Sequence, residues 1–214
     1  MSERIFITGI GTGVGKTVTA ACITEALKAD YWKPVQTGLL EGADTDTIKE
    51  LLSNDVSVCH PELWKLELPA SPHLAAREEQ VKIEPGAIIS RAADLQPVGR
   101  RLVIEGAGGL MVPLNDDYFT ADLIRELGAK AIVVAQNYLG SINHALLTAG
   151  MLRRLGIHVL GWVFTGDYHS NEDDVVKWSG YPKIGRIPRA QHVDKSFVQQ
   201  QAQLLSANLH SLLA

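Results

Sequence analysis

The chain has 214 residues, 46% of them hydrophobic, which is enough for the core of one α/β domain covering residues 1–214. Its net charge of −4 and its pI near 6.0 argue against nucleic acid and against an anionic membrane as partners, because both bind basic surfaces. Cys22 and Cys59 have neither disulfide nor metal-ligand spacing. No apolar run has the length of a membrane span or of a signal segment, so we expect a cytoplasmic protein.

Residues 4–17 have the order of an apolar strand, a glycine-rich turn and the start of a helix. The turn ends in Gly15-Lys16-Thr17, and good helix formers follow over residues 18–28. Glycines let the backbone aim several N–H groups at one phosphate, and the first amides of the helix add unpaired donors. The pattern predicts a phosphate-binding loop, with Lys16 on the β- and γ-phosphates and the Thr17 hydroxyl on Mg²⁺.

This loop departs from the commonest pattern at one position. Ile10 stands where a glycine is expected, and Gly9 lies one position earlier, so the loop is one residue longer than usual. The alternative is a flexible strand–helix turn with a chance lysine, which the Gly-Lys-Thr ending in this context disfavours.

Apolar runs and helical periodicity predict the remaining elements in chain order. Strands are expected over residues 31–35, 102–105, 131–135, 159–164 and 183–187, and helices over 47–52, 73–79, 85–94, 119–127, 142–155 and 196–213. Residues 54–70 show no regular pattern. The alternation predicts an α/β fold of the P-loop NTPase type, with a mostly parallel sheet and helices on both faces. Ligands of such sheets bind at the carboxyl ends of the strands, where residues 9–17, 33–38, 105–109, 136–144 and 164–167 fall.

Carboxylates at these strand ends are candidate Mg²⁺ ligands beside Thr17. Glu105 directly follows an apolar run, as a metal-facing acid would, and the alternative is an acid that simply reaches solvent. Asp46 is the second candidate, and it is equally suited to cap the following helix. Asp44 is a rival to Asp46. We expect Thr17, Asp46 and Glu105 to bind the metal.

Two further segments offer groups for an anionic ligand. Lys33 lies near the end of the second expected strand and can supply a second cation to the phosphates, or it is an ordinary surface lysine. Thr37 can hydrogen-bond the same ligand. At the start of the strongest predicted helix, residues 140–143 either present free amides to an anion or form a common serine N-cap.

Together these segments resemble the dethiobiotin synthetases over nearly the whole chain. The motifs that carry the resemblance, in order, are the extended loop of residues 9–17, Lys33-Pro34-Val35 with Thr37-Gly38, Ser71-Pro72-His73, Glu105-Gly106-Ala107-Gly108-Gly109, residues 139–144 and Gly161-Trp162-Val163. The resemblance implies an enzyme of biotin synthesis that joins 7,8-diaminononanoate, CO₂ and ATP. In this reaction the 7-amino group takes up CO₂ as a carbamate, and a carbamate oxygen attacks the γ-phosphate. The 8-amino group then closes the ring from a carbamic–phosphoric anhydride.

The resemblance also implies roles for individual residues. Lys16 and Lys33 hold the carbamate and the γ-phosphate together in the catalytic centre, and Mg²⁺ binds Thr17, Asp46 and Glu105. In a homodimer, the carboxylate of the diamine is held by the partner subunit. The implied nucleotide contacts are Gly13, Val14, Gly15, Lys16, Thr17, Val18, Asp46, Glu105, Gly106, Ala107 and Gly108. The implied substrate contacts are Thr12, Thr37, Gly140, Ser141, Ile142 and Asn143.

One position differs from the family pattern. After Gly-Trp-Val the better-known members carry Ala-Asn, whose asparagine reads adenine, whereas this chain has Phe164-Thr165. A threonine cannot reproduce the paired donor and acceptor of an amide. We therefore expect backbone contacts to the base around Thr165, Gly166, Ile187 and Pro188, and looser selection among nucleoside triphosphates.

The main alternative is a partitioning or septum-site ATPase of the ParA and MinD type, which shares the fold and the extended loop. These proteins carry a signature lysine five residues before the loop lysine, and Gly11 occupies that position here. The terminal helix over 196–213 also lacks the basic face of a membrane-binding tail.

Overall fold

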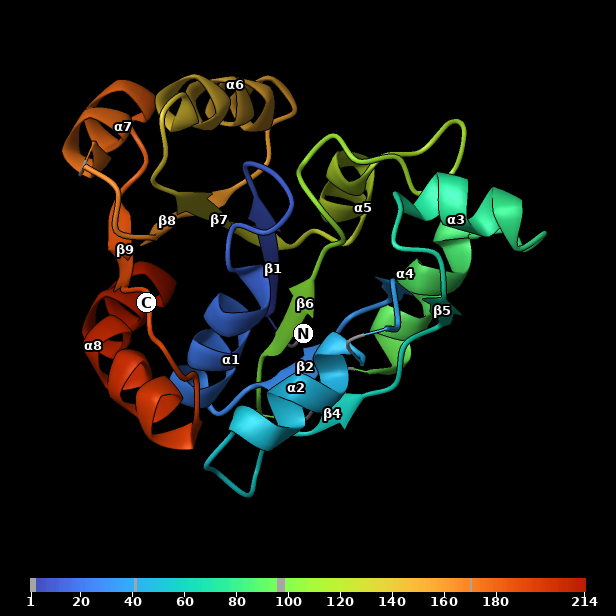
Figure 1. Ribbon diagram of the computed structural model, residues 1–214, viewed down its shortest axis with the longest axis horizontal. Coiled ribbons are helices and arrows are strands. Elements are labelled where there is room, and N and C mark those ends of the chain that lie inside the picture. The colour runs from blue at the N-terminus through green and yellow to red at the C-terminus, as the bar shows by residue number, and fades with distance from the viewer. Residues whose placement is uncertain (1–2, 41, 96–98, 170) are drawn as a thin grey trace.

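The computed structural model describes residues 3–40, 42–95, 99–169 and 171–214. Residues 1–2, 41, 96–98 and 170 of the expected single domain lie outside this description. The centre of the described structure is a seven-stranded sheet in the order β4-β2-β6-β1-β7-β8-β9, in which every pair of neighbouring strands is parallel. The predicted α/β fold of the P-loop NTPase type is confirmed, with β1 in the middle of the sheet (Figure 1).

The strands of the large sheet are β1 (Arg4–Gly9), β2 (Asp30–Trp32), β4 (Cys59–His60), β6 (Leu102–Glu105), β7 (Lys130–Gln136), β8 (Val159–Thr165) and β9 (Lys183–Ile187). Two short strands, β3 (Val35–Thr37) and β5 (Trp64–Leu66), pair in parallel as a separate sheet. The helices are α1 (Lys16–Leu27), α2 (Asp44–Leu51), α3 (Pro72–Glu78), α4 (Pro85–Asp94), α5 (Thr120–Glu126), α6 (Ser141–Arg154), α7 (Glu172–Ser179) and α8 (Lys195–Leu213).

Helices cover both faces of the large sheet because its strands are apolar on both sides. Along β1, Ile5 and Ile7 belong to a core cluster shared with α1, α2 and α8. Phe6, between them, faces the opposite cluster, which includes residues from α3 to α7. This alternation is the period-two pattern of a strand buried on both faces, and it leaves the carboxyl ends of the strands as the open edge.

The predicted strand over residues 31–35 is wrong as one element. Pro34 has no N–H to donate to a ladder, and the chain leaves the large sheet after Trp32 and enters the small sheet at Val35. Lys33 therefore lies in the gap between the two sheets. The irregular stretch over 54–70 contains the short strands β4 and β5, and α7 was not predicted. No helix in the described part of the chain is long and apolar enough to cross a membrane.

Candidate active site

A cavity of about 550 Å³ opens at the carboxyl ends of β1 and β6 and beside α2. It is lined by Thr12, Gly13, Gly15, Lys16, Thr17, Val18, Lys33, Gln36, Thr37, Gly38, Gly42, Asp44, Thr47, Glu105, Ala107 and Gly108. Most of the residues expected around the phosphates, the metal and the reacting groups are thus brought together by three separate segments of the chain.

The phosphate loop has the backbone that its glycines predict. Gly15 has φ +89°, in the left-handed region that glycine adopts without strain, and it precedes the first residue of α1. Lys16 bends back so that its Nζ donates a 3.0 Å hydrogen bond to the Gly11 carbonyl. Burial lowers the pKa of the Lys16 amine, with nearby Glu105 acting in the opposite direction. An anionic ligand in the cavity would supply the charge that this buried cation lacks.

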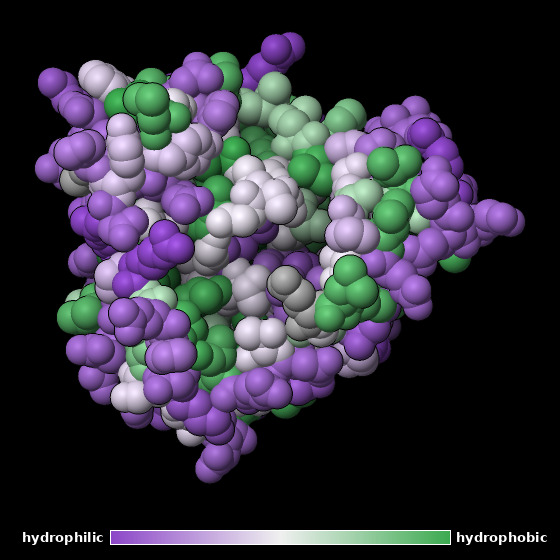
Figure 2. All heavy atoms as spheres, viewed as in Figure 1, coloured by the Kyte–Doolittle hydropathy of each residue, from purple (hydrophilic) through white to green (hydrophobic). Residues whose placement is uncertain are grey.

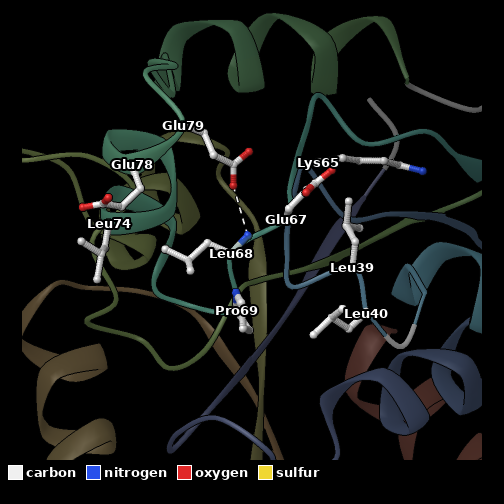
Figure 3. Close-up of a pocket in the computed structure, with 9 residues that line it drawn as sticks. All are labelled: Leu39, Leu40, Lys65, Glu67, Leu68, Pro69, Leu74, Glu78 and Glu79. Carbon is white, nitrogen blue, oxygen red and sulfur yellow. Dashed lines mark hydrogen bonds between the residues drawn. The ribbon is translucent and has the colours of Figure 1, made fainter.

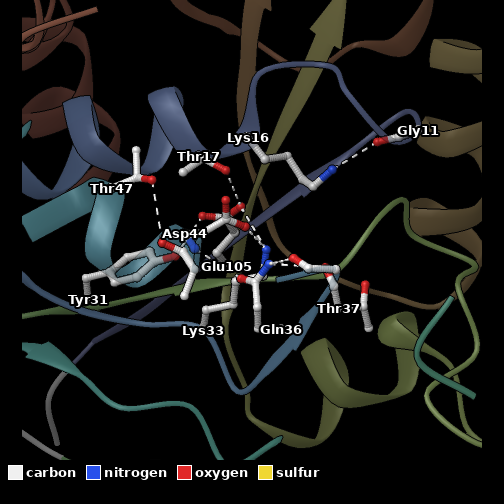
Figure 4. Close-up of polar contacts among 12 residues, drawn as sticks. Gly11, Lys16, Thr17, Tyr31, Lys33, Gln36, Thr37, Asp44, Thr47 and Glu105 are labelled. Carbon is white, nitrogen blue, oxygen red and sulfur yellow. Dashed lines mark hydrogen bonds and ion pairs between the residues drawn. The ribbon is translucent and has the colours of Figure 1, made fainter. Parts of the chain in front are cut away.

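Glu105 is the most constrained acid of the site, with 1% of its surface exposed. Thr17 donates to its Oε1 at 3.0 Å, and the Tyr31 hydroxyl donates to its Oε2 at 2.9 Å (Figure 4). The Nζ of Lys33 lies 3.6 Å from Oε1. A buried carboxylate needs such partners, and these three hold it at the edge of the cavity beside the phosphate loop.

Lys33 is buried between two acids and is therefore no surface lysine. It forms ion pairs with Asp44 and with Glu105. Burial alone would lower the pKa of its ammonium, but the two carboxylates outweigh burial and the pKa is raised. Gln36 fixes this arrangement, because its Oε1 accepts a 3.2 Å hydrogen bond from the main-chain N–H of Asp44.

The structure favours Asp44 over Asp46 as the second acid of the site. Asp44 lines the cavity next to Lys33. Asp46 does not line it: its side chain is 60% exposed and pairs with Lys49 at 3.2 Å on the outer surface of α2. The helix begins at Asp44 rather than at residue 47, and this turns the two side chains in different directions.

The remaining expected nucleotide contacts are divided between the cavity and its surroundings. Ala107 and Gly108 line it, whereas Gly106 lies against the ring of Phe6, where a Cβ would come within 2.7 Å. Val14, within the loop itself, is buried and does not line the cavity. The expected base contacts do not line this cavity. They lie where two strands end, at Thr165 and Gly166 for β8 and at Ile187 and Pro188 for β9.

The expected anion site at residues 140–143 begins α6 but is not part of the same cavity. Its N-cap is Gly140, with φ +100°, and not Ser141, whose hydroxyl accepts a 3.1 Å hydrogen bond from Asn171. Ile142 and Asn143 lie in the first turn of the helix. Any ligand shared by this segment and the phosphate loop must reach across from one to the other.

A second cavity, of about 1130 Å³, shares no lining residue with the first. Its walls come from residues 39–40, from β5 and the segment after it, and from α3 (Figure 3). Its lining combines four leucines and Pro69 with the charged residues Lys65, Glu67, Glu78 and Glu79, and it contains none of the expected site residues.

Three side chains of the site were not predicted from the sequence. Tyr31, Gln36 and Thr47 either line the cavity or hold its acids. Tyr31 lies between Asp30 and Trp32 in β2, and its burial beside Glu105 raises the pKa of its hydroxyl well above the usual value. The signal that the sequence offered for Tyr31 and Gln36 was their position close to Lys33, which had been predicted as a site residue.

The fold and the site define a P-loop NTPase. The AAA domain family matches residues 3–196. Septum site-determining protein MinD from Pyrococcus horikoshii, solved with Mg-ADP, has a TM-score of 0.69 over 100% of this chain and 98% of its own, at 14% identity. MinD from Pyrococcus furiosus gives 0.67 over 99% and 100%, also at 14% identity. These similarities show the fold alone.

Relatives with higher sequence identity identify the family more narrowly than the fold does. The ATP-dependent dethiobiotin synthetase of Cytophaga hutchinsonii is 44% identical over 96% of this chain and 98% of the relative. That of Christiangramia forsetii is 44% identical over 95% and 96%. The chain belongs to the dethiobiotin synthetase family, and ParA- and MinD-type ATPases are distant structural relatives.

Proposed function

We propose that this protein carries out the ATP-dependent carboxylation and ring closure of 7,8-diaminononanoate with CO₂, giving dethiobiotin, ADP and phosphate. Its relatives are named for dethiobiotin synthesis and match it over nearly their full length. The observation that carries the proposal is the pairing of two buried lysines, Lys16 and Lys33, in one cavity with a phosphate loop. A nucleotide-binding switch needs the first lysine, and phosphorylation of a carbamate also uses the second.

The proposed chemistry needs alignment of oxygen atoms more than covalent help from the protein. The 7-amino group forms a carbamate with CO₂ and releases a proton. A carbamate oxygen then attacks the γ-phosphorus, the bond to the ADP oxygen breaks, and the 8-amino group finally displaces phosphate from the anhydride. Lys16 and Lys33 neutralise the charge on the transferring phosphoryl group, and Thr12 and Thr37 orient the carbamate.

The residues of the cavity fit a magnesium ion. Mg²⁺ prefers oxygen ligands, and it is commonly held by one or two carboxylates together with phosphate oxygens and water. Thr17 Oγ1 lies 3.0 Å from Glu105 Oε1, and Lys33 forms ion pairs with both Asp44 and Glu105. We assign the metal to Thr17, Asp44 and Glu105, with Asp44 replacing Asp46. When bound, the ion neutralises charge on the β- and γ-phosphates.

We propose a homodimer in which residues Gly140 to Asn143 of the partner subunit bind the substrate carboxylate. The separation of this segment from the phosphate cavity supports the idea, because one chain does not place both ends of the site together. Large apolar side chains near it are exposed, with Leu139 at 86% and Leu147 at 66%. Figure 2 shows other apolar groups interspersed with hydrophilic ones around a hollow in the face that it displays.

Two finer expectations belong to this proposal. The enzyme works in the cytoplasm, where its nucleotide is supplied, and it accepts nucleoside triphosphates other than ATP. The second follows from Thr165 in place of the family asparagine, with base contacts left to the backbone around Gly166, Ile187 and Pro188.

The test is phosphate release from MgATP and bicarbonate, measured with and without 7,8-diaminononanoate, with dethiobiotin detected by mass spectrometry. We expect release to depend strongly on the diamine. Release that is indifferent to the diamine, with no dethiobiotin formed, would refute the proposed reaction and favour an ATPase switch.

A further inference from the structure

Thr165 makes a contact inside the phosphate loop although it lies far from that loop in sequence. Its hydroxyl donates a 2.8 Å hydrogen bond to the main-chain carbonyl of Val14. Its methyl group lies against Gly15, the residue after Val14, since a Cβ built on Gly15 would be 3.2 Å from Thr165 Cγ2. Both Thr165 and Val14 are buried.

This hydrogen bond determines which way the following amide points. The described peptide bonds are all trans, and in a trans peptide the carbonyl of one residue and the N–H of the next point in opposite directions. The Val14 carbonyl is turned toward β8 by the hydroxyl of Thr165. The N–H of Gly15 is therefore directed away from β8, and Gly15 lines the cavity expected to hold the phosphates.

Thr165 is well placed to fix the loop because it is itself held by the central sheet. It pairs with Gln136 of β7 on one side and with Ile187 of β9 on the other. Its own carbonyl accepts a 2.9 Å hydrogen bond from Asn137. By contrast, the loop glycines supply no side chain that could hold the Val14–Gly15 peptide in one orientation.

The same contacts leave Thr165 poorly suited to read a base. Its hydroxyl hydrogen is already committed to Val14. The adjoining Gly166 carbonyl accepts a 2.8 Å hydrogen bond from Arg186, whose Nε lies 3.4 Å from the buried carboxylate of Glu172. The Thr165 hydroxyl and the Gly166 carbonyl are thus already engaged within the protein.

We propose that Thr165 is a positioning residue of the phosphate loop, which orients the Gly15 amide toward a bound polyphosphate, and that it takes no part in choosing the base. The inference rests on the proposed nucleotide site but not on the proposed diamine chemistry. Nucleotide binding therefore tests it even if no dethiobiotin is formed.

The experiment compares three variants of the full-length protein. Thr165→Val keeps the methyl contact and removes the hydroxyl, whereas Thr165→Ser keeps the hydroxyl and removes the methyl. Thr24→Val is the matched control, since Thr24 is also a buried threonine and its hydroxyl has no hydrogen-bond partner within the described residues. Calorimetry gives the Kd of MgATP, of MgCTP and of inorganic tripolyphosphate with Mg²⁺, and thermal unfolding without ligand reports stability.

We expect Thr165→Val to weaken all three ligands by the same factor, about fivefold, as for loss of one hydrogen bond. Thr165→Ser and Thr24→Val should stay within about twofold of the wild type. If Thr165→Val does not fold, Thr165→Cys carries the comparison, because a thiol is a weaker donor and should give a smaller loss that is again equal for the three ligands.

Three results would overturn the proposal. A loss confined to MgATP, with tripolyphosphate unaffected, would make Thr165 a base reader. Unchanged Kd values with a lowered melting temperature would leave it a merely structural residue. A loss that Thr165→Ser fails to recover would assign the effect to the methyl contact and not to the hydroxyl.

Discussion

Replacing Lys33 by alanine removes a buried cation from between two acids. Its Nζ lies 3.6 Å from Glu105 Oε1, a separation worth an attraction of about 5 kcal/mol at an effective dielectric constant of 20. Part of this attraction offsets the cost of burying Lys33, which the variant no longer bears. Glu105 also keeps its hydrogen bonds from Thr17 and Tyr31. We therefore expect the free energy of unfolding to fall by about 3 kcal/mol.

A loss of this size lowers the melting temperature of a domain with 214 residues by about 6–12 °C. The pKa of Lys33 is raised in the folded protein, so its contribution is fully present below the unfolded-state pKa of about 10.4 and is lost as pH rises through the folded-state pKa. The difference between wild type and variant should accordingly be constant from about pH 6 to about pH 9. Thermal denaturation at three pH values measures it.

The same substitution should affect turnover far more than nucleotide binding. We expect diamine-dependent phosphate release to fall on the order of a thousandfold, while the Kd for MgATP stays within about threefold. Lys49→Ala, which removes a 53% exposed lysine from α2, is the matched control and should change neither quantity. Near-normal turnover would refute the role of Lys33 in the reaction, and an unchanged melting temperature would refute the electrostatic argument.

Other predictions follow from the site and the surface. Asp44→Asn should weaken Mg²⁺ binding in the presence of nucleotide by about tenfold or more, while Asp46→Asn stays within about twofold; equal effects in a magnesium titration would contradict the assignment. Burial raises the pKa of Cys59 to about 11, so its reaction with a thiol reagent at pH 8 should be slow until the protein unfolds, and rapid labelling of the native protein would count against this. Leu147→Glu should convert the proposed dimer to monomers in sedimentation velocity, and a persistent dimer would place the interface elsewhere.

The phosphate loop could be predicted because its determinants are local. Glycines that permit positive φ, a Gly-Lys-Thr ending and a following helix are all contained within residues 9–28, and the structure has the same order. Glu105 was predictable for a similar reason, since an acid directly after an apolar strand has one obvious location at the edge of a parallel sheet.

The choice between Asp44 and Asp46 was not local. The two acids are equally plausible by pattern, and the start of α2, together with the hydrogen bond from the Asp44 amide to Gln36, decides which one faces Lys33. The separation of β2 from β3 likewise depends on a partner strand, β5, that lies in a stretch without a clear pattern. The missed helix α7 did carry signals, with three acids in its first turn and Gly180 after its last residue.

The packing of α8 on α1 has a consequence for how the protein is made. Val198, Leu205 and Leu209 of the last helix cover the same core cluster as Ile23 of the helix that follows the phosphate loop. During synthesis α1 leaves the ribosome before α8 has been made, so the apolar side of α1 that α8 covers stays exposed until residues 195–213 follow. Contacts this distant in sequence form late and slowly. Over this interval the growing chain carries an exposed apolar surface of the kind that favours aggregation and that chaperones protect.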